Sequence, residues 1–256
     1  MIIKCRTDKG NVREINEDYV LTMVTDKFSL LIIADGMGGH NAGEIASQTA
    51  STFIRDYIFE KYNEYENKEE ILRDAVVNAN AKVYENSLTD IKLKGMGTTI
   101  TCCILAQDKL FLSHVGDSRA YIINKEGIKK ITQDHSYVQE LLDNGSITEN
   151  EAIKHPQRNV ITRAVGVEKY VVVDTKTLEF NDDDILLLCT DGLSNYISNE
   201  DIYKIVMDKK EAAADELVNI ANENGGSDNI SVIIARKEDG KWIIWQGRYL
   251  VIDIFY

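Results

Sequence analysis

The chain has 256 residues, 44% of them hydrophobic, which is enough to bury the core of one large domain without a disulfide or metal staple. Its net charge is −13, from 29 basic and 42 acidic residues, and no run of Lys and Arg is longer than two. Nucleic-acid binding is therefore disfavoured, because a polyanionic partner needs a basic surface.

The cysteines and the hydropathy pattern indicate the compartment. No segment has the apolar core of a signal peptide, and none approaches the ~18 uninterrupted apolar residues of a membrane span. The four cysteines lie in apolar segments and show no CxxC spacing, which is typical of reduced core residues. We expect a cytoplasmic protein without a membrane span.

Taken in chain order, apolar segments that are β-branched or alternating predict strands. These lie at 2–7, 19–25, 29–34, 98–105, 109–115, 120–123, 171–178, 185–189 and 230–235. Helical periodicity covers 42–60, 69–87 and 212–222, with short helices around 137–142 and 148–153. No linker or repeat interrupts the chain, and the only proline is Pro156. We expect one domain over residues 1–236 and an extension of uncertain role over 237–256.

The connections between the predicted strands favour an antiparallel arrangement. Most are tight polar turns, such as "TDKF" and "AQDK". Long helices early and late in the chain, with many strands between them, differ from an alternating βαβ pattern. The sequence therefore predicts class α+β, with sheets covered by helices.

Four acids stand at or just beyond the ends of apolar strands: Asp35, Asp117, Asp191 and Asp228. Strand ends can meet in one pocket even when they are distant in sequence, and carboxylates crowded together repel one another unless a cation lies between them. All candidate ligands are oxygens, which favours Mg²⁺ or Mn²⁺ over zinc. Glycines directly after Asp35 and Asp191 would let a backbone carbonyl approach an ion without a Cβ in the way.

A single Asp-Gly pair at a strand end is more simply explained as turn chemistry. Turn chemistry does not explain why all four acids follow the most hydrophobic strands. A further polar cluster, "RxxNED", places Arg13, Asn16, Glu17 and Asp18 just before another predicted strand. Taken together, the four strand-end acids and this cluster support a metal site about as well as they support turns, when only the residues are considered.

Eight motifs, in this order, resemble those of the type 2C metal-dependent protein serine/threonine phosphatases in their compact bacterial form. They are "GNVREINED", "ADGMGGHNAGEIAS", "GMGTT", "VGDSRAY", "DHS", "HPQRNVITRAVG", "LLCTDGLS" and "GGSDNISVI". The resemblance covers about residues 1–236. It implies an α-β-β-α sandwich, in which two mainly antiparallel sheets pack face to face with helices on both outer sides.

The resemblance also implies a metal-ligand set. Asp35 would bridge two Mn²⁺ or Mg²⁺ ions, the Gly36 carbonyl would reach the second ion, and Asp191 and Asp228 would hold the first. Glu17 and Asp18 match acids that reach the second ion directly or through water. Asp117 matches an acid that shares a third, weaker ion with Asp191.

The mechanism that the resemblance implies is in-line attack of a metal-bridging hydroxide on phosphorus. Arg13 matches the family's phosphate-binding arginine, whose planar fork suits two phosphoryl oxygens. Animal members carry a His directly after the Asp-Gly pair, but here that position is Met37. His40, three residues later, is a candidate general acid, and a metal-bound water is the alternative.

The implied function is hydrolysis of phosphoserine and phosphothreonine on proteins by a monomeric enzyme in bacterial signalling, opposing a bacterial Ser/Thr kinase. Two other readings stay open. A two-metal phosphodiesterase or nuclease would use the same ion geometry, although the charge of −13 disfavours it. A phosphoprotein-sensing module without turnover is the non-catalytic alternative.

Two segments beyond the acids match no simple structural pattern. Residues of about 136–165 resemble the family's mobile flap, and a polar segment beside a site commonly gates substrate. The tail "WIIWQGRYLVIDIFY" extends past the family's usual ending. Its alternation is compatible with an added strand, a docking segment or a cloning-derived extension.

Overall fold

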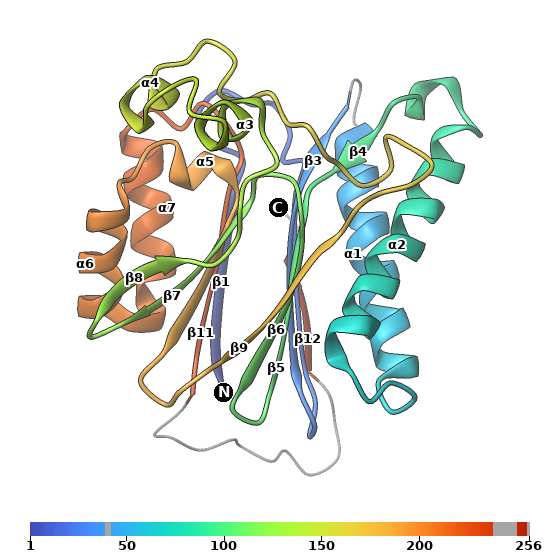
Figure 1. The fold of residues 1–256 in the computed structure, drawn as a ribbon, viewed down its shortest axis with the longest axis horizontal. Helices are drawn as coiled ribbons and strands as arrows, with labels where there is room; N and C mark the ends of the chain where they lie inside the picture. The colour runs from blue at the N-terminus through green and yellow to red at the C-terminus, as the bar shows by residue number, and fades with distance from the viewer. Residues whose placement is uncertain (39–41, 238–249, 255–256) are drawn as a thin grey trace.

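Two antiparallel β-sheets stand face to face at the centre of the molecule, with helices on both outer sides (Figure 1). The computed structural model describes residues 1–38, 42–237 and 250–254, the last five by their backbone alone. The first sheet has the order β1 (Ile2–Asp8), β11 (Ile230–Arg236), β10 (Ile185–Cys189), β7 (Arg119–Asn124), β8 (Gly127–Lys130). The second has the order β12 (Leu250–Ile254), β2 (Asp18–Val24), β3 (Ser29–Met37), β5 (Ile100–Ala106), β6 (Lys109–Val115), β9 (Asp174–Glu179), and β4 (Gly97–Thr98) pairs with β3. The expected α-β-β-α sandwich is confirmed.

The outer layers are helix pairs. Helices α1 (Ala42–Lys61) and α2 (Lys68–Ser87) cover the second sheet, and α6 (Asn199–Lys209) and α7 (Ala213–Glu223) cover the first (Figure 1). Single 3₁₀ turns follow α2 at η1 (Ile91–Leu93) and α6 at η2 (Lys210–Ala212). Asn67 caps α2 by accepting a hydrogen bond from the Glu69 backbone N–H, which fixes where this helix begins.

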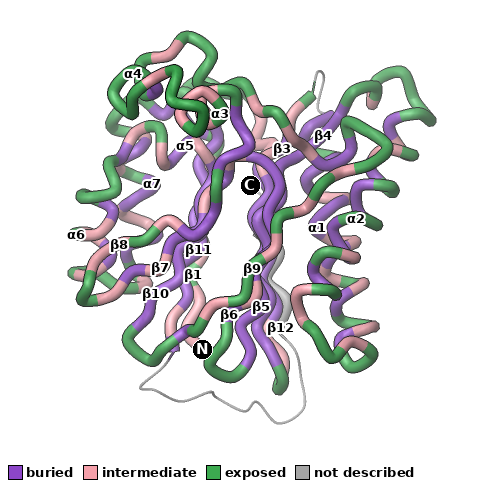
Figure 2. The backbone as a smooth tube through the Cα atoms, in the orientation of Figure 1, coloured by how far each residue is buried: buried purple, intermediate pink, exposed green. Residues whose placement is uncertain are grey.

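The core lies in three apolar layers, one between the sheets and one beneath each helix pair. In β2, Val20 packs between the sheets while Leu21 packs beneath α1 and α2. Both faces of the central strands are therefore buried, as Figure 2 shows along both sheets, and such strands are near-continuous apolar runs in sequence. A strand packed on both sides has little freedom, so the residues at its end are held firmly in position.

The flap, residues 136–165, lies between β8 and β9 at one end of the sandwich (Figure 1). It contains α3 (Tyr137–Asp143) and α4 (Glu149–Ile153), which confirm the two short helices expected there. Ser136 caps α3, and Thr148 forms a capping box with Glu151 at the start of α4. These caps compensate for the few buried side chains in both helices.

Several elements differ from the sequence-based expectation. The sequence did not predict α6, because six of its eleven residues have charged or amide side chains and only Ile202 and Val206 are fully buried. Strand β8 was also missed. The strand expected over 98–105 is split at Thr99, and the one expected over 171–178 begins at Asp174.

Candidate metal centre

The acids that follow apolar strands gather at the flap end of the sandwich. Asp18 begins β2 and pairs in register with Asp35 near the end of β3. In the first sheet, Asp191 follows β10 as the first residue of α5 (Asp191–Ser194), and Asp228 precedes β11. Asp117 lies in the connection between β6 and β7. Both sheets therefore contribute carboxylates to one cluster, as the spacing predicted.

Asp18 joins the two sheets. Its Oδ2 accepts hydrogen bonds from the hydroxyls of Thr190 at 2.9 Å and Ser231 at 2.6 Å, both on the opposite sheet. Only 7% of Asp18 is exposed. Burying a carboxylate this deeply is costly unless both of its oxygens have partners. The two hydroxyl contacts involve only Oδ2.

The carboxylates strongly perturb one another. Burial, together with the charges of Asp18, Asp191, Asp117 and Asp228, raises the pKa of Asp35 well above its usual value. Burial also raises the pKa of Asp18 to about 7, of Asp117 to about 8 and of Asp191 to about 6. For each of these three the nearby acid charges add to the effect of burial. The cluster thus holds more negative charge than it can stabilise without protons or a cation.

Two oxygens show that the cluster fits a cation. Within the described part of the chain, Asp18 Oδ1 and Asp191 Oδ1 are buried and have no hydrogen-bond partner. The donors are hard oxygens, which suits Mg²⁺ or Mn²⁺. No three His, Cys, Asp or Glu side chains among the described residues form a ready-made metal site. Asn195 donates to the other oxygen of Asp191, Oδ2, at 3.0 Å, which leaves Oδ1 for an ion.

Arg13 and Glu17 lie on the loop between β1 and β2 at the edge of this cluster. The Arg13 guanidinium contacts both carboxylate oxygens of Asp228, each at 2.9 Å, and about half of its side chain is exposed. Burial is the main cause of the raised pKa of Glu17, whose side chain is near the backbone of Gly43 in α1. An exposed guanidinium beside a cluster of acids is suitably placed to bind an incoming anion.

The glycines that follow Asp35 and Asp191 have a packing reason that the sequence analysis did not anticipate. A Cβ on Gly36 would lie 2.2 Å from the Gly43 carbonyl oxygen and 2.5 Å from that of Glu17. A Cβ on Gly192 would lie 1.9 Å from the Asn229 carbonyl oxygen. Both positions require glycine because backbone segments touch there, whatever the Gly36 carbonyl binds.

Residues that the sequence analysis did not single out hold these loops in place. Thr99, at the break between β4 and β5, accepts the Asp35 backbone N–H at 2.9 Å and hydrogen-bonds the Ser118 hydroxyl at 2.8 Å. Asn229 accepts the Glu17 N–H at 2.8 Å and donates to the Ile15 carbonyl at 2.9 Å. They belong to the quoted motifs "GMGTT" and "GGSDNISVI", so the signal was present, but polar residues at strand ends look alike in sequence.

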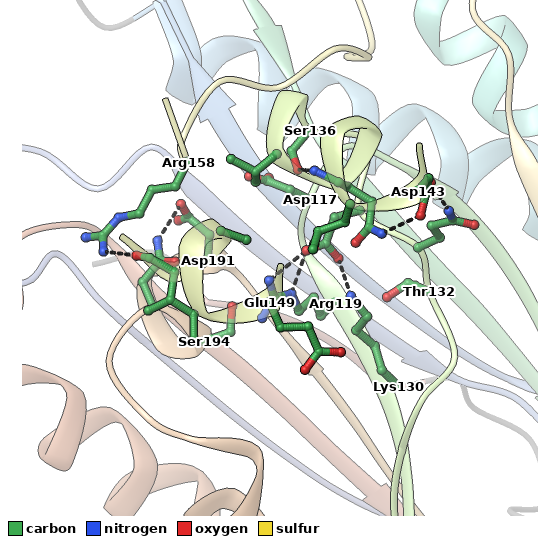
Figure 3. Close-up of a pocket in the computed structure, with 18 of the residues that line it drawn as sticks. Asp117, Arg119, Lys130, Thr132, Ser136, Asp143, Glu149, Arg158, Asp191 and Ser194 are labelled. Atoms are coloured by element: carbon green, nitrogen blue, oxygen red, sulfur yellow. Dashed lines mark hydrogen bonds and ion pairs between the residues drawn. The ribbon is translucent and has the colours of Figure 1, made fainter. Parts of the chain in front are cut away.

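A cavity of about 1010 Å³ extends from the acid cluster beneath the flap. Figure 3 shows Asp117 and Asp191 lining it together with Arg119 and Lys130. Arg119 and Lys130 both pair with Asp134, at 2.6 Å and 3.1 Å. Apolar and polar side chains of α3 and α4, among them Val138, Leu142 and Glu149, form part of its wall.

The remaining candidate, His40, lies outside the described residues, and the structure does not place it. His114 is 1% exposed and is hydrogen-bonded to the Thr101 hydroxyl and the Gln133 carbonyl. Burial lowers its pKa to about 3, so it is a neutral structural histidine, as expected from its place in a strand.

Comparison with known proteins supports the resemblance. The family model described as Protein phosphatase 2C matches residues 10–233. The chain belongs to the protein phosphatase 2C family. It is thus related to enzymes that remove phosphate from proteins, and the match spans every carboxylate of the cluster.

Individual members of the protein phosphatase 2C family agree with this assignment. The Listeria monocytogenes serine/threonine phosphatase stp is 37% identical over 239 residues, which cover 91% of this chain and 94% of that protein. The Streptococcus agalactiae serine/threonine phosphatase structure has a TM-score of 0.85 and 35% identity, covering 93% and 99% of the two chains. A structure of the PstP catalytic domain in complex with two manganese ions has a TM-score of 0.79 and 34% identity, covering 91% and 96%.

Proposed function

We propose that this chain hydrolyses phosphoserine and phosphothreonine esters in proteins, using two Mn²⁺ or Mg²⁺ ions held by the acid cluster. The single observation that carries the proposal is the cluster itself, with two unpartnered buried oxygens at Asp18 and Asp191 and strongly raised carboxyl pKa values. The family match and the manganese complex of PstP support the choice of metal and reaction.

Asp35, Asp191 and Asp228 would hold the ions, with the Gly36 carbonyl, Glu17 and Asp18 completing the second site directly or through water. When bound, the ions supply the Lewis acidity that activates water and neutralises phosphoryl charge. A third, weaker site would use Asp117 and Asp191. The charge of Asp191 raises the pKa of Asp117, and a cation between the two carboxylates would relieve their repulsion. Loading the site would displace the protons that these carboxyls otherwise hold.

Arg13 would bind two phosphoryl oxygens of the substrate with its planar guanidinium. Its Nη2 already contacts both carboxylate oxygens of Asp228, which holds the guanidinium at the rim of the cluster. Because charge on those oxygens grows during in-line displacement, this contact would strengthen in the transition state. His40 is the candidate donor of a proton to the leaving oxygen, with a water as the alternative.

The biological setting is inferred from the family. We place the enzyme in the cytoplasm as a monomer that opposes a bacterial Ser/Thr kinase, with residues 1–236 as the catalytic domain. No helix in the described part of the chain is long and apolar enough to cross a membrane. The net charge of −13 favours protein substrates over nucleic acids.

The experiment that tests this function measures phosphate release from a phosphothreonine peptide with Mn²⁺. Asp35→Asn keeps the side-chain volume but removes the charge, so we expect at least a loss of about a hundredfold, more than outer-shell changes cost at metal sites. Asp183→Asn is the matched control, because this acid is 71% exposed and, among the described residues, its ion pair is with Lys125.

EDTA should abolish the wild-type activity and Mn²⁺ should restore it. A near-normal rate for Asp35→Asn with Mn²⁺ present would show that the proposed site is wrong. Release of nucleotides from DNA or RNA at a rate matching peptide dephosphorylation would instead support the phosphodiesterase reading.

A further inference from the structure

Tyr196 joins the two segments that carry Asp191 and Asp228. It follows α5, which begins at Asp191. Its hydroxyl shares a hydrogen bond with the hydroxyl of Ser227, the residue directly before Asp228. One contact between side chains therefore connects the neighbours of two acids that lie 37 residues apart in the chain.

Two further contacts hold Tyr196 against the segment 224–228. Its carbonyl accepts a hydrogen bond from the Asn224 side chain at 3.1 Å. Its ring lies against Gly225, where an added Cβ would be 3.2 Å from Tyr196 Cε1. The tyrosine thus contacts this segment with its backbone, its ring and its hydroxyl, and the hydroxyl is the part that reaches the residue before Asp228.

The same segment is also in close contact with the loop between β1 and β2. The Asn11 backbone N–H donates to the Gly226 carbonyl at 2.7 Å. A Cβ on Gly10 would lie 2.2 Å from the Asp228 carbonyl oxygen. Two separate parts of the chain therefore hold the segment that carries Asp228, and Tyr196 belongs to the part that also carries the other acid.

Asp228 depends on such contacts more than Asp35 does. Asp35 is paired in register with a residue of β2, whereas Asp228 lies before β11 begins. About a quarter of the Asp228 side chain, 28%, is exposed. Its carboxylate contacts Arg13 and accepts the Asn229 N–H at 2.9 Å. A carboxylate on an exposed loop has more freedom than one at a buried strand end, so its position needs support from side chains.

We propose that Tyr196 is a positioning residue for Asp228, and that its hydroxyl sets the place of this acid relative to Asp191 through Ser227. The proposal rests on the proposed function, because it treats both acids as ligands of one ion. An ion shared by two carboxylates needs both of them held at a fixed separation, and groups that orient ligands contribute substantially to metal affinity. In this role Tyr196 is not itself a ligand.

Two substitutions remove the two halves of the hydrogen bond. Tyr196→Phe deletes one hydroxyl and keeps the ring on Gly225, and Ser227→Ala deletes the other hydroxyl. We expect each to weaken one Mn²⁺ site about tenfold, the lower end of the loss when an outer partner of a metal ligand is removed. The double variant should bind Mn²⁺ no worse than either single variant, because both changes remove the same bond.

The binding measurement is calorimetric titration of EDTA-treated protein with Mn²⁺. Asp228→Asn removes the ligand itself and identifies which site is affected. Tyr203→Phe is the matched control, because Tyr203 packs against the same apolar cluster as Tyr196 but lies on α6, which packs on β7 and β8.

A second readout separates positioning from loss of folding. In Tyr196→Phe, the Mn²⁺ concentration for half-maximal phosphate release should rise about tenfold. The rate at saturating Mn²⁺ should stay within about twofold of the wild type, because bound ions hold the carboxylates in place. The urea midpoint of this variant in EDTA should change no more than that of Tyr203→Phe.

Wild-type Mn²⁺ affinity in Tyr196→Phe, an equal loss in Tyr203→Phe, or losses that multiply in the double variant would each overturn the proposal. A lower urea midpoint in EDTA, with a rate that saturating Mn²⁺ does not restore, would do so as well, since Tyr196 would then only support folding. The titration needs no substrate. A wild-type protein that binds Mn²⁺ but releases no phosphate would therefore contradict the proposed function, while the variants still decide the role of Tyr196.

Discussion

At the scale of single residues, Asp18 shows why this site requires a cation. Hydroxyls from the opposite sheet satisfy one of its oxygens, and the other is buried without a partner. Burial makes an ionised carboxylate in that position costly, which raises the pKa of Asp18 to about 7. A cation would replace the carboxyl proton and satisfy the free oxygen.

The raised pKa values predict how the stability of the metal-free protein depends on pH. Folded pKa values of about 7 for Asp18, 8 for Asp117 and 6 for Asp191, against 3.8 unfolded, mean that the folded state binds more protons between pH ~4 and ~8. The free energy of unfolding therefore falls as pH rises through this window, by about 3 kcal/mol for Asp191 alone.

Urea unfolding in EDTA at pH 5 and pH 8 measures this dependence. Asp117→Asn should flatten it, because the asparagine has no proton to lose, and saturating Mn²⁺ should raise stability most at pH 8. Stability that increased with pH in the metal-free protein would contradict the assigned carboxyl environment.

At the scale of elements, close backbone contact positions the acids as much as strand pairing does. Helix α5 begins at Asp191 and packs against the start of β11, where Gly192 meets the Asn229 carbonyl. Asn229 in turn anchors the loop that carries Glu17. The contact between Gly192 and Asn229 thus determines the relative positions of α5, the start of β11 and the loop that carries Glu17.

Gly192→Ala should therefore destabilise the protein by about 3 kcal/mol, because its Cβ would lie 1.9 Å from a backbone oxygen that cannot rotate away. Gly95→Ala is the control, since that position has φ +76° but open space around it, and we expect a cost of about 1 kcal/mol. Denaturant midpoints measure both. Equal losses of stability in the two variants would show that the backbone around Asn229 moves to make room for the added Cβ.

At the scale of the whole molecule, the C-terminal segment completes the second sheet. Strand β12 pairs antiparallel with β2, from Leu250 opposite Val24 to Ile254 opposite Val20. Without it β2 would be an edge strand, and an exposed apolar edge invites pairing with another chain. Strand β12 lies beyond the matched family region, which ends at residue 233. The alternation in the tail therefore does form a strand, over Leu250–Ile254.

A chain ending at residue 237 should melt about 5 °C lower and associate more strongly at high concentration, because it lacks β12. It keeps Lys237, which pairs with Asp108 and Asp182. A chain ending at residue 254 is the control. Thermal melts and size-exclusion chromatography provide the measurements, and identical behaviour of the two chains would show that β12 contributes nothing to the sheet edge.

The sequence by itself determined the local chemistry. Apolar runs that end in Asp35 and Asp191 predicted strands carrying acids, because strand periodicity and hard-ligand preference are local properties. Helix α6 escaped prediction because most of its residues are polar, although Ile202 and Val206 pack it against the first sheet.

Only the tertiary structure decided which groups meet. Asp18 contacts Ser231, 213 residues away, and Gly192 needs its missing Cβ because of Asn229. The hydrogen bonds of His135 to Gly116 and to Asp174 of β9 likewise join positions that no spacing along the chain encodes. Such contacts arise when two sheets pack together, and their energies depend on distances in space, whereas sequence patterns report only distances along the chain.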